Sequence, residues 1–535
     1  MIKIKAIQEN PKVGDIKGNT ELLERHLESA KAEGVNLLVF SEMFLSGYPP
    51  EDLVMREDFL HEMKRSIDSI IPKTKEISLI FGAPVREDNR LYNAAIFVQN
   101  GKFVDSYFKQ ILPNYKEFDE KRYFEKGTKN KILSINGVSI GMSICEDIWS
   151  EDFVKRLVDE GAEIILNLSA SPFTISKKET RLKMLEDYYE KYNRPIIYVN
   201  QTGGQDELVF DGSSLIVGLE DNNLKILNSF QTDSISLSYD KLKFISTTNE
   251  ENLNPNKLDD IYDALVLGTR DYVEKNGFKG VIIGSSGGID SALTTVIAHD
   301  ALGKEKVKTV MMPFDYTSDI SLEDAKSLAM NLGISHSEIS IKEMFEAFNK
   351  GLSTSFNGLK ADKTEENLQS RCRGVTLMAL SNKLGYLVLT TGNKSEAAVG
   401  YSTLYGDTAG GFSVLKDVSK TLVYELAKYR NKRSVVIPQR IIDRPPSAEL
   451  APDQKDTDSL PDYDRLDPIV EMYVEKDKSI QEIIGEGFDE NEVRKIVSLI
   501  DFNEYKRRQA PLGIKISDRN FGKDRRYPIT NAWKP

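Results

Sequence analysis

The sequence predicts an α/β protein in which a layered α/β domain is followed by a doubly wound parallel sheet. Its 535 residues exceed what a single hydrophobic core usually organises, so two to four domains are expected. Short apolar, strand-like runs alternate with helical patterns along most of the chain. A Ser- and Gly-rich loop, Gly284–Ser291, stands between a buried strand-like run and a helical run, as at the edge of a parallel sheet.

The first half of the chain mixes strands and helices. Strand-like runs occur at Ile2–Ile7, Asn36–Phe40, Ser78–Phe81, Leu91–Val98, Val138–Ile144, Ile164–Leu168 and Ile196–Val199. Helical patterns occur at Asn19–Ala32, Phe59–Ile71 and Lys178–Tyr192. Asn100-Gly101 joins two strand-like runs and is a strong hairpin signal. This order predicts a layered α/β domain over residues 1–245.

A polar stretch around residues 243–256 contains Asn254-Pro255-Asn256 and breaks the periodicity, so residues 246–256 are expected to be a linker. A second domain is then expected over residues 257–535. Its predicted strands are Val281–Ile283, Val307–Met312 and Tyr386–Thr391, and its predicted helices include Ala292–Leu302 and Ser321–Leu332, the latter with Ser321 as N-cap. The Pro- and Asp-rich segment Ile437–Leu460 is expected to be a long loop or lid.

Composition excludes several classes of protein. The net charge of −12 argues against general nucleic-acid binding, and no apolar run approaches the length of a membrane span. At the N-terminus, apolar and charged residues alternate as in a β-strand, and the segment does not resemble a signal peptide. Only Cys145 and Cys372 are cysteines, which favours a reducing, cytoplasmic location without disulfides.

The loop Gly284–Ser291 is suited to phosphate binding. A glycine-rich turn before a helix N-terminus presents backbone N–H groups and the positive end of the helix dipole to an anion. Ser286 and Ser291 can add hydroxyl donors, and Asp290 places a carboxylate where Mg²⁺ could bridge protein and phosphates. The spacing excludes both the Walker A loop and the Gly-x-Gly-x-x-Gly dinucleotide loop.

The letters Ser-Gly-Gly-x-Asp-Ser resemble the pyrophosphate loop of the N-type ATP pyrophosphatases, which cleave ATP to AMP and pyrophosphate while adenylating a substrate oxygen. That resemblance implies ATP as co-substrate and Mg²⁺ as cofactor. The expected ATP-binding residues are Gly284, Ser286, Gly287, Gly288, Asp290, Ser291 and Thr391.

In the first half, three reactive side chains each follow a strand-like run: Glu42, Lys109 and Cys145. Strand ends can converge on one pocket, and these groups are complementary. A cysteine thiolate is a nucleophile that needs a base, a carboxylate can carry the proton to a leaving amine, and an ammonium can stabilise an oxyanion.

The sequence segments around these residues, among them Phe40–Pro49 and Cys145–Trp149, resemble motifs of the nitrilase superfamily. The Glu-Lys-Cys triad of that superfamily would be Glu42, Lys109 and Cys145 here. The fold implied is an α-β-β-α sandwich. Many nitrilases use a second glutamate between the Lys and the Cys, and Glu117 and Glu120 are both possible.

Further matches, Asn167–Phe173 and Asn200–Glu207, are similar to the glutaminase domain of glutamine-dependent NAD⁺ synthetases. By that resemblance glutamine would be held by Tyr48, Tyr115, Glu146, Ser171 and Lys177. The family often has Arg where this chain has Lys177, so the cation is kept but a bidentate carboxylate clamp is not.

The second half adds Thr391–Glu396, Tyr405-Gly406-Asp407 and Lys420, which resemble the NAD⁺ synthetases. The resemblance implies that deamido-NAD⁺ is bound by Asn367, Arg371, Glu396, Asp407 and Lys420, and Mg²⁺ by Asp290 and Glu396. Asn367 and Arg371 are four residues apart, so they share one helix face.

The function implied is a ligase that hydrolyses glutamine and uses the ammonia to amidate adenylated deamido-NAD⁺, giving NAD⁺, AMP, pyrophosphate and glutamate. The family's synthetase domains pair, so at least a homodimer is expected. Three alternatives are weaker: another amidotransferase with the same loop, a stand-alone carbon–nitrogen hydrolase, and a nucleotide sensor without catalysis.

Overall fold

The computed structural model describes residues 1–220, 224–240, 243–246, 257–447, 449–451, 454, 456–458 and 460–529, and divides the chain into two compact units, Met1–Asn256 and Lys257–Pro535. Apart from Ser246, which ends strand β15 (Phe244–Ser246), the expected linker at 246–256 lies outside the described residues. Within the described residues, no helix is both long enough and apolar enough to span a membrane.

Unit 1 contains four α-helices and fifteen strands in its described residues. The helices are α1 (Ile16–Ala32), α2 (Glu57–Ile70), α3 (Glu151–Asp159) and α4 (Lys177–Tyr192). The strands before β15 are β1 (Ile2–Gln8), β2 (Leu37–Val39), β3 (Ser78–Glu87), β4 (Arg90–Gln99), β5 (Lys102–Phe108), β6 (Ile132–Ile135), β7 (Val138–Ile144), β8 (Ile164–Ser169), β9 (Ile196–Asn200), β10 (Thr202–Gln205), β11 (Leu208–Asp211), β12 (Leu215–Val217), β13 (Leu224–Ile226) and β14 (Asp233–Tyr239).

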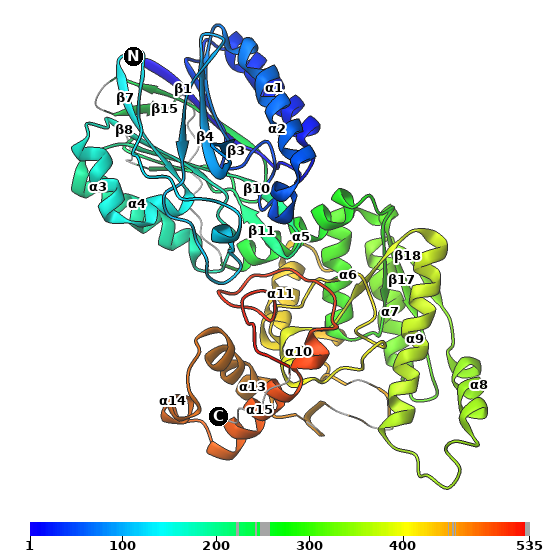
Figure 1. Cartoon of the computed structure of the whole chain (residues 1–535). Helices are drawn as coiled ribbons and strands as arrows, with labels where there is room; N and C mark the ends of the chain where they lie inside the picture. Colours follow the sequence, from blue (N-terminus) through cyan, green and yellow to red (C-terminus); the bar gives the residue numbers. More distant parts are fainter. Residues whose placement is uncertain are drawn as a thin grey trace. The chain divides into compact units, whose positions relative to one another are not determined.

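Two mixed sheets form the middle layers of unit 1. One has the order β15-β14-β1-β2-β3-β4-β5 and the other β13-β12-β9-β8-β7-β6. Because side chains alternate along a strand, Leu37 and Val39 of β2 join the core between the sheets, while Leu38 packs under the outer helices. Helices α1 and α2 lie side by side on the first sheet, and α3 and α4 lie on the second (Figure 1). The predicted layered α/β domain, an α-β-β-α sandwich, is confirmed.

Unit 2 is built on a five-stranded, fully parallel sheet of order β18-β17-β16-β19-β20. The strands are β16 (Val281–Gly284), β17 (Val307–Met311), β18 (Ser335–Glu338), β19 (Leu387–Thr390) and β20 (Phe412–Ser413). The helices are α5 (Lys257–Lys275), α6 (Ile289–Leu302), α7 (Asp319–Leu332), α8 (Lys342–Leu352), α9 (Lys363–Leu384), α10 (Lys394–Val399), α11 (Lys420–Arg433), α12 (Gln439–Asp443), α13 (Tyr463–Val470), α14 (Ile480–Gly485), α15 (Glu490–Phe502) and α16 (Glu504–Arg507).

Helices cover both faces of this sheet. Ile282 and Val388 pack with Cys372 of α9 in one apolar cluster, and the alternate residues of the strands point to the opposite face, where α6 lies. The predicted doubly wound parallel sheet is therefore confirmed, and Cys372 is a packing residue as expected. A helical subdomain, α13 to α15, buries its apolar stripes against α10.

Two local predictions were wrong. Helix α7 begins at Asp319 and its N-cap is Ser318, whose hydroxyl accepts from Ser321 N at 3.2 Å; Ser321 already lies inside the first turn. The segment Ile437–Leu460 is not all loop, because Gln439–Asp443 forms helix α12, and several of its later residues lie outside the described part of the chain.

Candidate active sites

Three strand ends bring Glu42, Lys109 and Cys145 together in unit 1. Glu42 follows β2, Lys109 follows β5 and Cys145 follows β7, and all three side chains are buried. Lys109 Nζ donates to Glu42 Oε1 at 2.8 Å with both side chains fully buried. A buried charge is tolerated only when it is paired, so this ion pair fixes both groups.

The Glu42 carboxylate is oriented by two further donors. Asn93 Nδ2 donates to Oε1 at 2.7 Å, and the backbone N–H of Ala170 donates to Oε2 at 2.9 Å. Asn93 comes from β4, next to the edge strand β5 of the first sheet, and Ala170 follows β8 of the other sheet. The carboxylate is thus held from both sheets of the sandwich, in one orientation, which suits a group that must take and return a proton.

Glu120, not Glu117, lies beside Lys109. Lys109 Nζ donates to Glu120 Oε1 at 2.7 Å, and Tyr48 OH donates to the same oxygen at 2.9 Å. Burial raises the pKa of Glu120 to about 7, and the Lys109 ammonium opposes that rise. Lys109 is therefore held between two carboxylates, those of Glu42 and Glu120.

Cys145 opens the short 3-10 helix Cys145–Trp149 with a positive φ of 43°. A non-glycine residue at positive φ is strained, and such strain collects at functional sites. Burial raises the pKa of the Cys145 thiol, the nearby Glu42 carboxylate raises it further, and the Lys109 ammonium lowers it. The thiol consequently needs a base to become nucleophilic at neutral pH.

The residues expected to hold glutamine surround this triad. Tyr115 OH donates to Glu146 Oε1 at 2.9 Å, and Ser171 is buried at the end of β8. The Lys177 ammonium lies 5.0 Å from the centre of the Trp149 ring, and burial lowers its pKa while the charges of Cys145 and Glu146 raise it. Tyr48 is buried and donates to Glu120, the carboxylate that also accepts from Lys109.

In unit 2 the loop after β16 leads directly into α6, as predicted. Gly287 has a φ of 76°, and a Cβ there would lie 2.4 Å from Ser321 O, so only glycine fits. Ser286 N and Gly288 O both bond the Ser291 hydroxyl, at 3.2 and 3.0 Å. The buried Ser291 hydroxyl therefore stabilises the loop through these internal hydrogen bonds, while Ser286 and Gly288 are exposed at the surface of the loop.

Asp290, Glu396 and Lys420 form a compact charged group at this loop. Lys420 Nζ donates to Asp290 Oδ2 at 2.5 Å and to Glu396 Oε1 at 3.1 Å. Burial raises the pKa of Glu396 to about 7, with Asp290 adding to the rise and Lys420 opposing it. The two carboxylates expected to bind a metal are thus neighbours, and both accept from Lys420, which was expected to bind deamido-NAD⁺.

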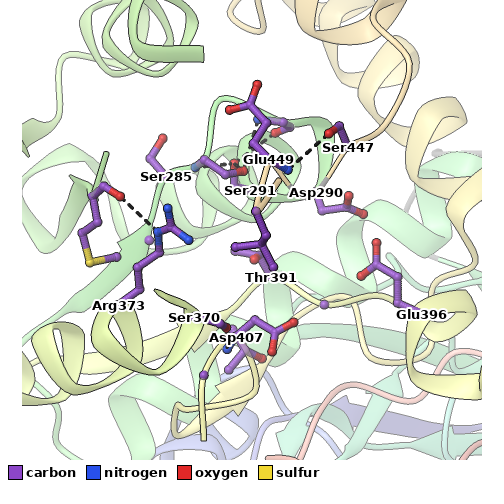
Figure 2. A pocket seen from close by; sticks show the side chains of 18 of the residues that line it. Ser285, Asp290, Ser291, Ser370, Arg373, Thr391, Glu396, Asp407, Ser447 and Glu449 are labelled. Carbon is purple, nitrogen blue, oxygen red and sulfur yellow. Dashed lines mark hydrogen bonds between the residues drawn. The ribbon is translucent and has the colours of Figure 1, made fainter. Parts of the chain in front are cut away.

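A pocket over the carboxyl ends of β16, β17 and β19 collects most of the predicted residues of unit 2 (Figure 2). Its lining includes Gly284, Ser286, Gly288, Asp290, Ser291, Thr391, Glu396, Asp407 and Lys420. Gly287 lines a smaller neighbouring cavity. Burial raises the pKa of Asp407 to about 6, and its carboxylate accepts from Thr403 N at 2.7 Å.

Asn367 and Arg371 do share one face of α9, but they face the loop 403–404. Asn367 Oδ1 accepts from Thr403 Oγ1 at 2.8 Å, and Arg371 Nε donates to Leu404 O at 3.2 Å. The residues of α9 that line the pocket are Ser370, Arg373, Gly374 and Leu377, at helical spacing on the adjacent face.

Comparison with known proteins follows the same division of the chain. The carbon-nitrogen hydrolase family model matches residues 3–239 and the NAD synthase model matches residues 261–510. The chain is 46% identical over 540 residues to the glutamine-dependent NAD(+) synthetase of Acinetobacter baylyi, covering 100% of this chain and 99% of the relative. The chain belongs to the glutamine-dependent NAD(+) synthetases. The enzyme of the same name from Thermotoga maritima is 42% identical over 570 residues, with coverage of 100% and 99%.

Solved structures of glutamine-dependent NAD(+) synthetases agree. That of the Acinetobacter baumannii enzyme, determined with adenosine diphosphate, has a TM-score of 0.80 at 42% identity and covers 99% of both chains. That of the Cytophaga hutchinsonii enzyme has a TM-score of 0.84 at 23% identity, covering 99% and 98%, which shows the common fold. The predicted family and the predicted class, an ATP-dependent, amide-forming ligase, are confirmed.

Several residues of this synthetase's sites were not singled out from the sequence. Asn93 is a polar residue in an otherwise apolar run, and nothing in the sequence marks its side chain as part of a site. Arg373 differs from its neighbour Arg371 only by its position around α9. Tyr401 and Asp456 also line the unit 2 pocket, from segments far apart in the sequence. Only the tertiary arrangement brings these residues to their sites.

Proposed function

We propose that unit 1 hydrolyses glutamine at Cys145 and that unit 2 uses the ammonia to amidate deamido-NAD⁺ activated by ATP. The observation that carries the first half is the buried Lys109 ammonium, held at 2.8 and 2.7 Å between Glu42 and Glu120 beside a thiol at a strained strand end.

In the first reaction Cys145 Sγ attacks the carboxamide carbon of glutamine, and Glu42 takes the thiol proton. The Lys109 ammonium stabilises the oxyanion of the tetrahedral intermediate. The C–N bond then breaks, Glu42 returns the proton to the leaving nitrogen, and ammonia and a glutamyl thioester are formed. Water, deprotonated by Glu42, attacks the thioester carbon, which releases glutamate and restores the thiol.

The surroundings of Cys145 suit an amino acid substrate. We assign Glu146 and Tyr115, joined at 2.9 Å, to the α-ammonium, and Lys177 to the α-carboxylate as a point charge. Ser171 and Tyr48 complete the pocket from β8 and from the loop after β2, where they shape the space for the side-chain amide.

In unit 2, ATP would lie in the pocket over β16, with its phosphates at the backbone of Ser286–Gly288, at Ser291 and at Lys420, and its sugar end toward Thr391. Asp290 and Glu396 offer adjacent carboxylate oxygens, the ligands that Mg²⁺ prefers, so they would hold the ion. When bound, Mg²⁺ neutralises charge on the triphosphate.

The nicotinate carboxylate oxygen of deamido-NAD⁺ attacks the α-phosphorus of ATP, and the bond to pyrophosphate breaks. Ammonia then attacks the carboxyl carbon of the adenylate, AMP leaves, and loss of a proton gives the carboxamide of NAD⁺. Asn367, Arg371 and Asp407 are assigned to deamido-NAD⁺, because they meet at the loop 403–407 next to the pocket.

The test compares two nitrogen sources in the wild type, Cys145→Ala and the control Cys372→Ala. NAD⁺ formation is measured from deamido-NAD⁺, ATP and Mg²⁺ with either glutamine or ammonium. We expect Cys145→Ala to lose only the glutamine-driven reaction and the packing variant Cys372→Ala to keep both. If the wild type makes no NAD⁺ from either source, the substrate assignment to unit 2 fails; if Cys145→Ala still uses glutamine, the nucleophile is wrong.

We also propose that the enzyme is cytoplasmic and a homodimer through unit 2. Cys145 and Cys372 are both free, as in a reducing compartment. Helix α8 buries none of its residues in the single chain and exposes Met344 and Phe348, and α9 exposes Val375. Sedimentation should give a dimer for the wild type and a monomer for Phe348→Glu; a monomeric wild type would overturn the proposal.

A further inference from the structure

A single buried carboxylate, that of Asp147, joins two of the strand ends that carry the triad of unit 1. Asp147 lies in the 3-10 helix that Cys145 begins, and its side chain is fully buried. Its Oδ1 accepts from the backbone N–H groups of Gln110 and Ile111 at 3.0 and 2.8 Å. These two residues directly follow Lys109, so the carboxylate reaches from the turn of the nucleophile to the segment that carries the ammonium.

The second oxygen of Asp147 completes the link. Its Oδ2 accepts from Ile144 N at 3.0 Å and from Tyr107 OH at 2.6 Å. Ile144 ends β7 of the six-stranded sheet and Tyr107 lies in β5 of the seven-stranded sheet, so one carboxylate bonds both sheets of the sandwich. Cys145 therefore follows a residue that Asp147 holds, and Lys109 has residues that Asp147 holds on both of its sides.

This arrangement requires a carboxylate. Each oxygen of an ionised carboxylate can accept two hydrogen bonds, whereas an amide has one accepting oxygen and an NH₂ group that would face donors. The four donors are three backbone N–H groups and one phenol, so Asp147 binds the chain itself and not a basic side chain. Burial raises the pKa of Asp147 to about 6, and the hydrogen bonds from Tyr107 and the backbone oppose that rise, so the group is ionised at neutral pH.

We propose that Asp147 is a positioning residue of the glutaminase reaction, which fixes the Cys145 thiol relative to the Lys109 ammonium so that the oxyanion of the tetrahedral intermediate meets that ammonium. This rests on the proposed function of unit 1. None of its four hydrogen bonds involves the side chain of Lys109 or Cys145, so Asp147 acts through their backbone. An error of about 1 Å in such a geometry can cost about 100-fold in rate.

The experiment measures glutamine hydrolysis in the full-length wild type, Asp147→Asn, Tyr107→Phe and the control Asp152→Asn, which changes an exposed carboxylate in the first turn of α3. Asp147→Asn should lower kcat about 100-fold. Its KM for glutamine should stay within about threefold, because Glu146 is held by Tyr115 and not by Asp147. Tyr107→Phe removes one donor and leaves three, so kcat should fall about three- to tenfold.

Folding is measured separately, because the loss of a buried acceptor also costs stability. Trp149 and Trp533 are the two tryptophans of the chain, so Trp149 fluorescence in a Trp533→Phe background gives the unfolding midpoint of unit 1. The value of kcat is then compared per folded molecule, well below that midpoint. NAD⁺ formation from ammonium should be the same in every variant, and Asp152→Asn should match the wild type in both reactions.

A merely structural residue would lower the unfolding midpoint and leave kcat per folded molecule unchanged. That result for Asp147→Asn, or a loss confined to KM, overturns the proposal. If Asp147→Asn does not fold, Tyr107→Phe decides, and a kcat equal to that of the wild type overturns the proposal. A wild type that hydrolyses no glutamine would instead refute the proposed function of unit 1.

Discussion

The ion pair between Arg181 and Asp211 makes a quantitative prediction about unit 1. Both side chains are fully buried, and Arg181, on α4, bonds Asp211 at the end of β11 through Nη2. The Nε and Nη1 atoms of Arg181 have no hydrogen-bond partner, so Asp211 provides the only charge compensation for it among the described residues. Asp211→Asn keeps the size of the side chain but leaves this guanidinium buried and unpaired.

Breaking a fully buried pair from one side costs about 3–5 kcal/mol, because an uncompensated charge remains in the interior. For a domain of this size each kcal/mol lowers Tm by about 2–4 °C, so unit 1 should unfold about 6–20 °C earlier. The KM for glutamine should rise as well, because α4 begins at Lys177.

The assay uses the two tryptophans, Trp149 in unit 1 and Trp533 in unit 2. In a Trp533→Phe background, tryptophan fluorescence reports the unfolding of unit 1 alone. The matched control is Lys191→Gln, which removes an exposed ion pair with Glu151 from the same helix and should cost at most about 1 kcal/mol. The double variant Arg181→Met with Asp211→Asn should recover most of the loss. Equal shifts for Asp211→Asn and the control would refute the reasoning.

Three further predictions follow from groups with shifted pKa values or buried pairs. Because burial raises the pKa of Glu120 to about 7, the Glu120 carboxylate is ionised and fully paired with Lys109 only above that pH. The value of kcat/KM for glutamine hydrolysis should therefore rise as the pH passes through about 7. The Glu120→Gln variant should lack that rise. Because burial raises the pKa of Cys145, inactivation by iodoacetamide should still be accelerating at pH 9; a plateau between pH 6 and 8 would contradict this. Lys394 is buried between Asp417 and Glu475, so Lys394→Met should destabilise unit 2 by about 3–5 kcal/mol. It should also slow NAD⁺ formation from ammonium, while glutamine hydrolysis stays normal. Unchanged thermal unfolding of unit 2 would contradict this prediction.

The sequence was most informative where chemistry and strand ends coincide. Glu42, Lys109 and Cys145 could be placed together because strand ends converge at one edge of a sandwich, and the phosphate loop could be placed because a glycine turn joins β16 to α6. The strand ends and the glycine turn are formed by residues that are close together in the sequence, so the apolar periodicity and the motif spacing are enough to predict them.

The rest depended on tertiary packing. Glu120 begins a short 3-10 helix between β5 and β6, where no periodicity distinguished it from Glu117, and only the fold turns it toward Lys109. Likewise Arg371 and Arg373 differ by about 200° around α9, and which of them faces the pocket is decided by how the helix lies on the sheet. The N-cap of α7 was misplaced because Ser318 and Ser321 are equally good caps by type.

The edge of the unit 2 sheet is completed from far along the chain. Ser413 N donates to Leu512 O at 2.8 Å, and the Asp417 carboxylate accepts from the backbone N–H groups of Ile516 and Ser517 at 2.8 and 2.7 Å. During synthesis at about 5–20 residues per second, β20 and the following loop would wait about 5–20 s for these partners. For that interval the newly made strand edge next to Lys420 has no covering chain, which leaves the ribosome-bound chain open to misassembly. Slowing translation downstream of residue 420 should therefore lower the yield of folded protein more than slowing it upstream.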